Sequence, residues 1–296
     1  MTGKQDQWAR WLLERRHGGD SKRLQALMDF LLPVRDRVLD NAALTGSETV
    51  LDVGCGDGLI AFGALRRLTS GQVIFSDISQ DLLAHAQALA DQLGILDQTQ
   101  FVQASATDLA PISDGSVDVV VLRSVLIYIA EKQNAFHSFY RVLKPGGRLS
   151  LFEPINRFGH PEPDHLLWGY DIVPVQAMAQ RIKAIYQYVQ PSDDPMFDFD
   201  ERDLIDMAQN AGFQTIHAEV RLDVVQERGQ TDWESFISVA PNPRVPTLAE
   251  AMREALSAEE INQFTQHLRP LVEVASAQSR RAVVYLWAIK DREKAS

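Results

Sequence analysis

One short segment of the sequence carries the residue types that a small-ligand site needs. Residues 50–58 read Val-Leu-Asp-Val-Gly-Cys-Gly-Asp-Gly, so an apolar run leads directly into glycines at alternate positions. Glycines permit tight backbone turns and let a ligand approach the main chain closely. The spacing is G-x-G-x-G, whereas the dinucleotide fingerprint G-x-G-x-x-G would need its third glycine where Leu59 stands. The segment therefore predicts a ligand-binding turn that differs from a dinucleotide site.

Two carboxylates belong to this turn. Asp52 stands two positions before the first glycine, where a carboxylate can receive the ammonium group of a bound amino acid and would not help with a pyrophosphate. Asp77 ends the next apolar run, where an acid accepts hydrogen bonds from the ribose hydroxyls of an adenosine ligand. The alternative is that Asp77 merely caps the helix expected from Ser79. Together the two acids predict a site for an adenosyl amino acid.

Alternating strands and helices must position these residues. Short apolar runs predict strands, and segments with helical periodicity lie between them. This alternation implies right-handed crossovers and an α/β, doubly wound, Rossmann-like sheet of seven strands with helices on both faces. The expected strands are 49–53, 72–76, 100–103, 117–122, 148–152, 215–225 and 282–289, and the expected core helices are 59–68, 79–93, 131–143 and 200–211.

The regions outside this alternation predict additions to the core. Pro33 is expected to begin or kink a helix in the N-terminal part, and Ser257 opens a capping-box pattern in the C-terminal part. The expected organisation is a helical cap (1–45), a cofactor-binding core (46–155), an inserted substrate lid (156–199), a return helix and strand (200–225), a second helical insertion (226–280), and the last strand with a tail (281–296).

The motifs together resemble those of class I S-adenosylmethionine-dependent methyltransferases. Residues 51–58 resemble motif I of that family, Asp77 stands where its ribose-binding acid stands, and residues 143–149, Leu-Lys-Pro-Gly-Gly-Arg-Leu, are similar to its turn before strand five. The resemblance covers roughly residues 50–154 and implies S-adenosyl-L-methionine as the cofactor. It implies that the cofactor-binding residues are Asp52, Gly54, Cys55, Gly56, Gly58, Asp77, Ile78, Ser105, Ala106, Thr107, Asp108, Arg123, Ser124 and Tyr128.

The resemblance leaves two contacts open. Many relatives carry an acid against the adenine amino group at the position of Ser105, so either Ser105 or Asp108 is expected to make that contact. Arg123 follows the fourth expected strand, where it is either a carboxylate anchor for cofactor or substrate, or part of a surface ion pair.

Methyl transfer from a sulfonium needs a base only if the acceptor arrives protonated. His160 and His165 follow the fifth expected strand, at the edge of the sheet where ligands bind. They are the catalytic candidates, and the alternative is that both face solvent. Aromatic side chains can line an acceptor cavity, and the candidates are Trp8, Trp11, Tyr128, Phe158, Trp168 and Tyr170. For Trp8 and Trp11, packing of the cap helix is the favoured explanation.

Composition restricts the partners. The chain has 296 residues and a formal net charge of −11, so nucleic acid is not expected as a partner. No run of ~18 apolar residues predicts a membrane span, and the polar N-terminus predicts a cytoplasmic protein. Cys55 is the single cysteine, so no cysteine-based metal cluster can form, and the several cysteines of the arsenic methyltransferases, which parts of the chain resemble, are absent. His160, Glu162, Asp164 and His165 could bind a metal, but Pro161 and Pro163 interrupt any helical ligand spacing, so no metal is expected. A monomer or a homodimer is expected.

The resulting prediction is an S-adenosylmethionine-dependent methyltransferase that moves a methyl group by in-line displacement to a small-molecule acceptor. An oxygen acceptor is favoured, and nitrogen, sulfur or carbon acceptors are possible. The alternatives are a non-catalytic adenosylmethionine-binding or regulatory protein and a nicotinamide-dependent oxidoreductase. No motif in the insertions identifies the acceptor.

Overall fold

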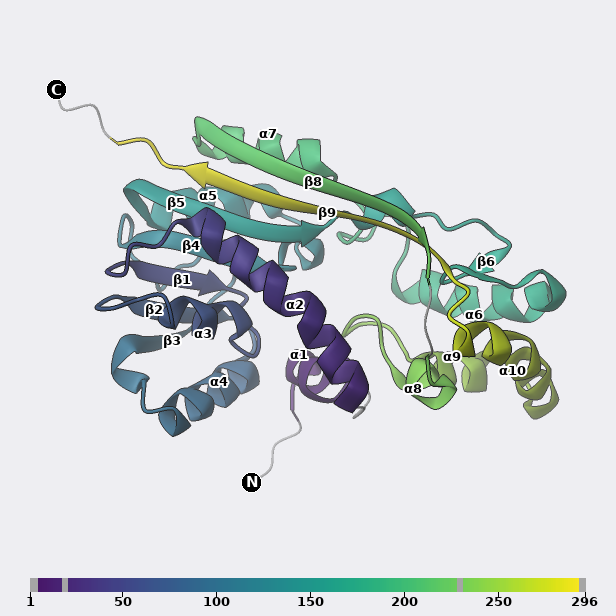
Figure 1. Cartoon of the computed structure of the whole chain (residues 1–296). Helices are drawn as coiled ribbons and strands as arrows, with labels where there is room; N and C mark the ends of the chain where they lie inside the picture. Colours follow the sequence, from purple (N-terminus) through teal and green to yellow (C-terminus); the bar gives the residue numbers. More distant parts are fainter. Residues whose placement is uncertain (1–4, 18–20, 228–230, 293–296) are drawn as a thin grey trace.

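The computed structural model describes residues 5–17, 21–227 and 231–292. A seven-stranded sheet forms its centre, in the order β3-β2-β1-β4-β5-β9-β8 (Figure 1). The first five of these strands run parallel, and β9 is antiparallel to both of its neighbours. The doubly wound sheet predicted from the sequence is confirmed. Its strands are β1 (Thr49–Val53), β2 (Gln72–Asp77), β3 (Thr99–Gln103), β4 (Val117–Arg123), β5 (Leu143–Pro154), β8 (Thr215–Gln226) and β9 (Gln278–Ile289).

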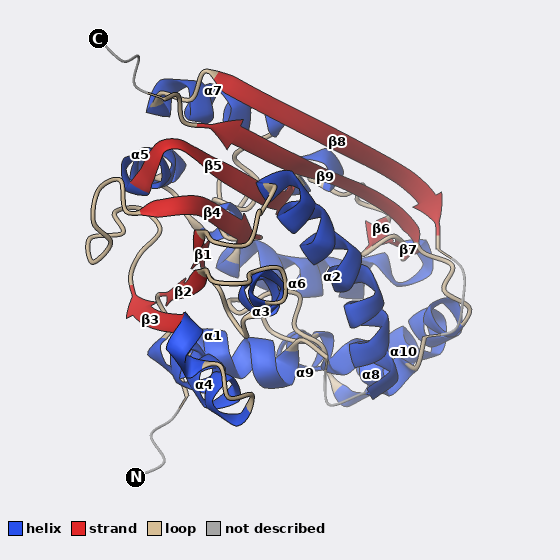
Figure 2. Ribbon diagram, turned by 60° about the vertical axis from the view of Figure 1, so that its left-hand side comes forward, coloured by secondary structure: helices blue, strands red, loops and turns tan. Residues whose placement is uncertain are grey.

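Helices cover both faces of the sheet, which explains why β1 and β4 are almost continuous apolar runs (Figure 2). One buried cluster joins the sheet to α2, α3 and α4 around Val38, Ile60 and Phe75. The other joins it to α5 and α7 around Phe136 and Leu204. The bounds are α2 (Ser21–Ala42), α3 (Leu59–Leu65), α4 (Gln80–Gln92), α5 (Lys132–Val142) and α7 (Glu201–Ala211), with short 3-10 helices η2 (Leu96–Gln98) and η3 (Leu126–Tyr128).

Several local predictions differ from the structure; β5, for example, begins at Leu143, five positions before the predicted Arg148. Pro33 lies inside α2, which continues from Ser21 to Ala42, so Pro33 does not begin a further helix; the packing of Val34 and Val38 in the buried cluster accompanies the unbroken helix. Strand β9 begins at Gln278, four positions before the predicted Ala282. Its extra residues pair with the end of β8 and their side chains are mostly exposed, so the apolar pattern of a buried strand is absent.

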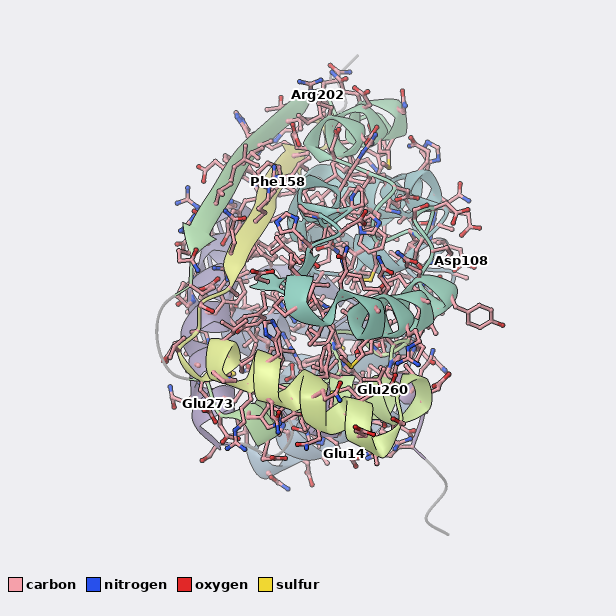
Figure 3. The ribbon with its side chains drawn as sticks, turned by 90° about the vertical axis from the view of Figure 1, so that its right-hand side faces the viewer. Glu14, Asp108, Phe158, Arg202, Glu260 and Glu273 are labelled. Carbon is pink, nitrogen blue, oxygen red and sulfur yellow. The ribbon has the colours of Figure 1, made fainter. Side chains whose placement is uncertain are left out.

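The two inserted segments pack together. A third buried cluster combines side chains from residues 167–182 with side chains from residues 233–272. The predicted capping box at Ser257 is present at the start of α10, and Figure 3 shows α10 between the labelled Glu260 and Glu273. This helical unit consists of η4 (Asn156–Gly159), β6 (Leu166–Leu167), β7 (Tyr170–Asp171), η5 (Val173–Val175), α6 (Gln176–Val189), α8 (Trp233–Ser238), α9 (Leu248–Ala255) and α10 (Ala258–Glu273).

The N-terminal segment connects the sheet to that helical unit. It consists of α1 (Gln7–Arg10) and the π-helix η1 (Trp11–Arg15). Asp6 caps α1 and also accepts a hydrogen bond of 2.6 Å from the hydroxyl of Ser79, at the start of α4. At the other end, the indole N–H of Trp11 donates to the carbonyl of Ala240 at 2.9 Å. Among the described residues, no helix has both the length and the apolar character that crossing a bilayer requires.

Candidate active site

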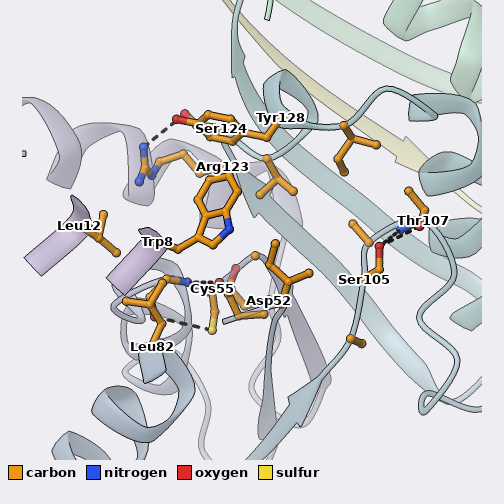
Figure 4. Close-up of a pocket in the computed structure, with 18 of the residues that line it drawn as sticks. Trp8, Leu12, Asp52, Cys55, Leu82, Ser105, Thr107, Arg123, Ser124 and Tyr128 are labelled. Atoms are coloured by element: carbon orange, nitrogen blue, oxygen red, sulfur yellow. Dashed lines mark hydrogen bonds between the residues drawn. The ribbon is translucent and has the colours of Figure 1, made fainter. Parts of the chain in front are cut away.

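A cavity of about 520 Å³ lies at the carboxyl ends of β1 and β4 (Figure 4). The strand order reverses between these two strands, because β1 continues to β2 and β3 on one side while β4 continues to β5 on the other. Open α/β sheets bind ligands at such a reversal. The volume also lies within the usual range of small-molecule pockets.

The glycine turn forms the floor of the cavity. Gly54 has a φ of +65°, and a Cβ added there would lie 2.5 Å from Cγ2 of Val125. Gly56 has a φ of +57°, and its added Cβ would meet only Cδ2 of Leu12, at 3.0 Å. A side chain at Gly56 would therefore fill the space between floor and roof. Glycine is required at both positions because of the backbone conformation and this close approach.

Gly58 lies outside the cavity lining, unlike the other two glycines of the turn. It precedes α3 with a φ of +86°, and an added Cβ would lie 2.5 Å from Cε2 of Phe62. Gly58 is not part of the cavity wall. The prediction that Gly58 contacts the cofactor is therefore not supported, and packing at the start of α3 explains the glycine.

Asp77 ties the floor to the end of β2. One carboxylate oxygen accepts a hydrogen bond from the amide of Gly56 at 2.9 Å, and the other accepts one from the amide of Ser79 at 2.8 Å. Ser79, rather than Asp77, caps α4. Burial raises the pKa of Asp77, although the two amides oppose this shift. Because a carboxylate has about four acceptor positions, Asp77 can hold the turn and still receive two hydroxyl groups of a ligand.

Asp52, near the end of β1, lines the cavity next to the glycine turn. Its carboxylate accepts a hydrogen bond from the amide of Ala61 at 2.9 Å. Burial raises the pKa of Asp52 to about 8, because desolvation outweighs the Ala61 hydrogen bond and the attraction of Arg123. Burial also raises the pKa of the Cys55 thiol, so Cys55 contributes a small neutral side chain to the wall. A cationic ligand group would favour the ionised form of Asp52.

The side of the cavity next to β2 and β3 contains Ser105 but not Asp108. Residues 104–107 and Ile78 line the cavity, and the hydroxyls of Ser105 and Thr107 lie 2.7 Å apart. Asp108 is exposed, accepts a hydrogen bond from the amide of Ala110, and is not part of the wall. The structure therefore does not support Asp108 as a cofactor contact, whereas Ser105 stays a candidate.

A buried acid that was not predicted from the sequence positions the cavity wall formed by Val125 and Tyr128. Glu153, near the end of β5, is fully buried, and its Oε1 accepts hydrogen bonds from the amides of Val125 and Leu126 at 2.8 and 3.0 Å. Among the described residues, its Oε2 has no partner. These bonds fix the segment that places Val125 and Tyr128 on the wall. An acid at the end of the fifth strand was visible in the sequence, but its burial beside β9 was not.

The N-terminal segment forms the roof. Trp8, Trp11 and Leu12 line the cavity, and the Trp8 ring lies edge-on to the Tyr128 ring with a centroid distance of 5.0 Å (Figure 4). The wider turn of η1 belongs to this stretch, and π-helical turns are frequent at functional sites. Of the aromatic candidates, Phe158, Trp168 and Tyr170 are not part of the wall.

The predicted catalytic histidines lie elsewhere. Neither His160 nor His165 is part of the cavity wall. The His160 ring stacks on Phe197 with a centroid distance of 3.9 Å, and His165 is exposed. Within the described insertions, Pro195 and Arg244 are the residues that reach the wall. Most of the insertions' side chains pack on each other instead of on the cavity. The position of the two histidines therefore does not support the prediction of a histidine base.

These residues fit an adenosyl amino acid. Asp77 offers acceptors for ribose hydroxyls, and Asp52 offers a carboxylate for a cationic group. Ile78 and Ser105 also line the cavity, and Gly56 leaves the floor open. Of the predicted cofactor residues, the cavity brings together Asp52, Gly54, Cys55, Gly56, Asp77, Ile78, Ser105, Ala106, Thr107, Arg123, Ser124 and Tyr128.

Comparisons with known proteins agree with this fit. Residues 50–147 match the family described as "Methyltransferase domain". Over 185 residues the chain is 30% identical to the ubiquinone/menaquinone biosynthesis C-methyltransferase UbiE of Salmonella paratyphi B, a match that covers 60% of this chain and 71% of that relative.

Solved structures show the same fold. The YcgJ protein of Bacillus subtilis superposes with a TM-score of 0.54 at 16% identity, covering 88% of this chain and 98% of YcgJ. Phosphoethanolamine N-methyltransferase 2 of Haemonchus contortus, solved with S-adenosyl-L-methionine, gives a TM-score of 0.52 at 17% identity, covering 88% of this chain and 53% of that chain. Family and fold together establish S-adenosylmethionine as the cofactor.

Replacing Asp77 by Asn is expected to weaken binding of S-adenosylhomocysteine by about 10- to 100-fold, because one acceptor and the negative charge are lost at the floor. The matched change Asp108→Asn removes an acid outside the cavity and should alter the dissociation constant by less than about 3-fold. Isothermal titration calorimetry measures both constants. Equal effects of the two substitutions would contradict the assignment of Asp77.

Glu153 should make stability depend on pH. Burial raises the pKa of Glu153 from 4.5 to about 7, so its neutral form stabilises the fold fully below the ordinary pKa and this contribution is lost as the pH rises through the folded-state value. In Glu153→Gln the amide oxygen still accepts the two backbone bonds. Between about pH 5.5 and about pH 8, the free energy of unfolding should fall by about 2 kcal/mol more in the natural protein than in the variant.

Urea unfolding of the ligand-free proteins across this pH range measures that difference. Parallel stability curves for the natural protein and the glutamine variant would show that Glu153 is already ionised in the folded state at low pH.

Proposed function

Because the chain belongs to the class I S-adenosylmethionine-dependent methyltransferases, we propose that it methylates a small-molecule acceptor, with an oxygen atom of the acceptor as the favoured nucleophile. The supporting observation is the cavity, whose floor fits the cofactor and whose lining as a whole is more apolar than polar. When bound, S-adenosylmethionine supplies an activated methyl group on a sulfonium sulfur.

The chain's own residues align the reactants and exclude water. Asp77 and the glycine turn fix the floor, and Glu153 fixes the wall that carries Val125 and Tyr128. Trp8 covers the space between them, and a dry, aligned site favours a displacement in which opposite charges cancel.

The apolar part of the lining favours an acceptor with an apolar body. Leu12 and Trp8 of the roof line the cavity together with Val125, Ile129 and Pro195, and apolar surface there is removed from water when a ligand packs on it. Among the described residues, the wall contains no histidine. An acceptor that ionises on its own, such as an acidic hydroxyl group, therefore suits the site because it needs no protein base.

A carbon acceptor is the second candidate. The relative from Salmonella paratyphi B is named a C-methyltransferase, and an ionised phenol or enol carries negative charge on carbon as well as on oxygen. The same cavity would bind either acceptor, and the orientation of its ring would select the atom.

The location, oligomeric state and partners of the enzyme are also proposals. We propose a cytoplasmic enzyme, either monomeric or homodimeric, without nucleic acid as a partner and without membrane attachment. The net charge of −11 supports the part that concerns nucleic acid.

Incubating the protein with methyl-deuterated S-adenosylmethionine and a panel of phenols, enols and their O-methylated analogues tests the proposal. Labelled product should form from members with a free acidic hydroxyl group, and tandem mass spectrometry should locate the label on oxygen. Label on ring carbon would overturn the oxygen assignment. Label found only on added protein or RNA would overturn the small-molecule assignment.

The double variant His160→Ala/His165→Ala provides a control for the same assay. Because both side chains lie outside the wall, turnover should stay within about 3-fold of the natural protein, whereas loss of a general base typically costs 10²- to 10⁴-fold.

A further inference from the structure

Strand β8 forms one edge of the sheet, and little of it is covered (Figure 1 and Figure 2). The strand is 12 residues long and pairs with β9 along its whole length. Its side chains are exposed except for Ile216 and Asp223, which are partly buried. A long exposed edge presents unpaired main-chain groups to other strands, and monomeric proteins usually block such edges with charges, prolines or covering segments.

The outward main-chain groups of β8 belong to its even-numbered residues. In an antiparallel pair, every second residue exchanges hydrogen bonds with the neighbouring strand. The amide of Glu227, which continues the register of β8, donates to the carbonyl of Ala277 at 2.8 Å. Odd-numbered residues therefore bond to β9, and Ala218, Val220 and Leu222 direct their N–H and C=O groups away from the sheet. Within the described part of the chain, no other main-chain group bonds to them.

The same even-numbered residues place an apolar row on one face of the edge. Val220, Leu222 and Val224 are 43%, 58% and 59% exposed. Val284 and Ala282 of β9 lie opposite Val220 and Leu222, and both belong to the buried cluster that packs against α5 and α7. The apolar layer of the core thus reaches β8 and is uncovered there. A second apolar row packed beside it would remove this surface from water.

The odd-numbered residues of β8 lie on the opposite face and include charges of both signs. In order, they are His217, Glu219, Arg221 and Asp223. Nε of Arg221 lies 2.8 Å from Oδ2 of Asp223, and Glu219 pairs with Arg37 of α2. The Arg221 side chain is 75% exposed, and a guanidinium has five N–H donors. Arg221 can therefore bind a further carboxylate without leaving Asp223.

The sequence of β8 is complementary to itself in one antiparallel register. When Val220 lies opposite Val220 of a second copy, Glu219 lies opposite Arg221, and His217 lies opposite Asp223. The outward groups of both strands meet in this register, because even-numbered residues face even-numbered residues. Moving the two-fold axis by one residue places Glu219 opposite Glu219 or Arg221 opposite Arg221, and like charges directly opposite each other are destabilising.

We propose that the β8 edge binds the β8 edge of a second copy of this chain, so that the two sheets join across a two-fold axis at Val220. The pairing occupies the β8 edge of both copies, so the assembly closes as a dimer. Among the described residues, neither β8 nor β9 contributes to the cavity lining. The dimer therefore leaves both cavities free and does not depend on the proposed function.

Analytical ultracentrifugation of the full chain between about 1 and about 100 μM measures the dimer dissociation constant. The natural protein should sediment as a dimer at the upper concentration. Val220→Lys puts two ammonium groups on the axis and should weaken the dimer by at least about 10-fold. The exposed Arg269 lies on α10, so Arg269→Glu is a matched charge change away from the edge and should alter the constant by less than about 3-fold.

A pair of charge-reversed variants tests the register. In Glu219→Arg two arginines face each other across the interface, and in Arg221→Glu two glutamates do, so each variant alone should dimerise at least about 10-fold more weakly. In an equal mixture every arginine again faces a glutamate, and dimers should form at concentrations where each variant alone is monomeric. Contacts within each chain are the same alone and mixed, so this comparison isolates the contact between copies.

Three results would overturn the proposal. A natural protein that is monomeric at about 100 μM would leave the edge to a different partner. A dimer that Val220→Lys does not weaken would place the contact on another surface. A mixture that stays monomeric would exclude the register, because an axis at Leu222 would set Arg221 against Asp223 and give no rescue. Circular dichroism melting curves check that each variant is folded.

Discussion

The carboxylate of Asp77 connects two chain segments that must stay in register for the cavity to exist. Its two oxygens accept hydrogen bonds from the amide of Gly56, in the turn after β1, and from the amide of Ser79, at the start of α4. The hydroxyl of Ser79 in turn donates to Asp6, below the roof. These hydrogen bonds connect the glycine turn, the end of β2 and the N-terminal segment to one another. They also hold the Asp77 carboxylate in place before a ligand binds.

The rest of the site follows from placing acidic and basic side chains on different parts of the cavity. The acids Asp52 and Asp77 lie on the floor, and the bases Arg123 and Arg244 line the cavity together with Tyr128. Burial makes each charge costly, so ligand groups of the opposite sign gain most from binding. An adenosyl amino acid carries cationic groups and a carboxylate, which explains how one small cavity accommodates both kinds of side chain.

The sequence determined the core more completely than the roof. The parallel strands, the glycine turn and both acids were predictable because burial on both faces produces continuous apolar runs that end at the ligand edge. The roof depends on contacts between distant residues, such as Trp11 with Ala240, and an amphipathic pattern does not specify the partner of its apolar face. The loop histidines were misleading for the same reason: the sequence places them after the fifth strand, but His160 stacks on Phe197 and neither histidine lines the cavity.

The central claim is that the glycine turn and the N-terminal segment enclose one cofactor. Hydrogen–deuterium exchange with and without S-adenosylhomocysteine tests it most directly. The structure predicts slower exchange in both residues 54–58 and residues 7–16, with unchanged exchange around His160 and His165. Protection that spares the glycine turn, or that appears around the two histidines while residues 7–16 exchange as before, would contradict it.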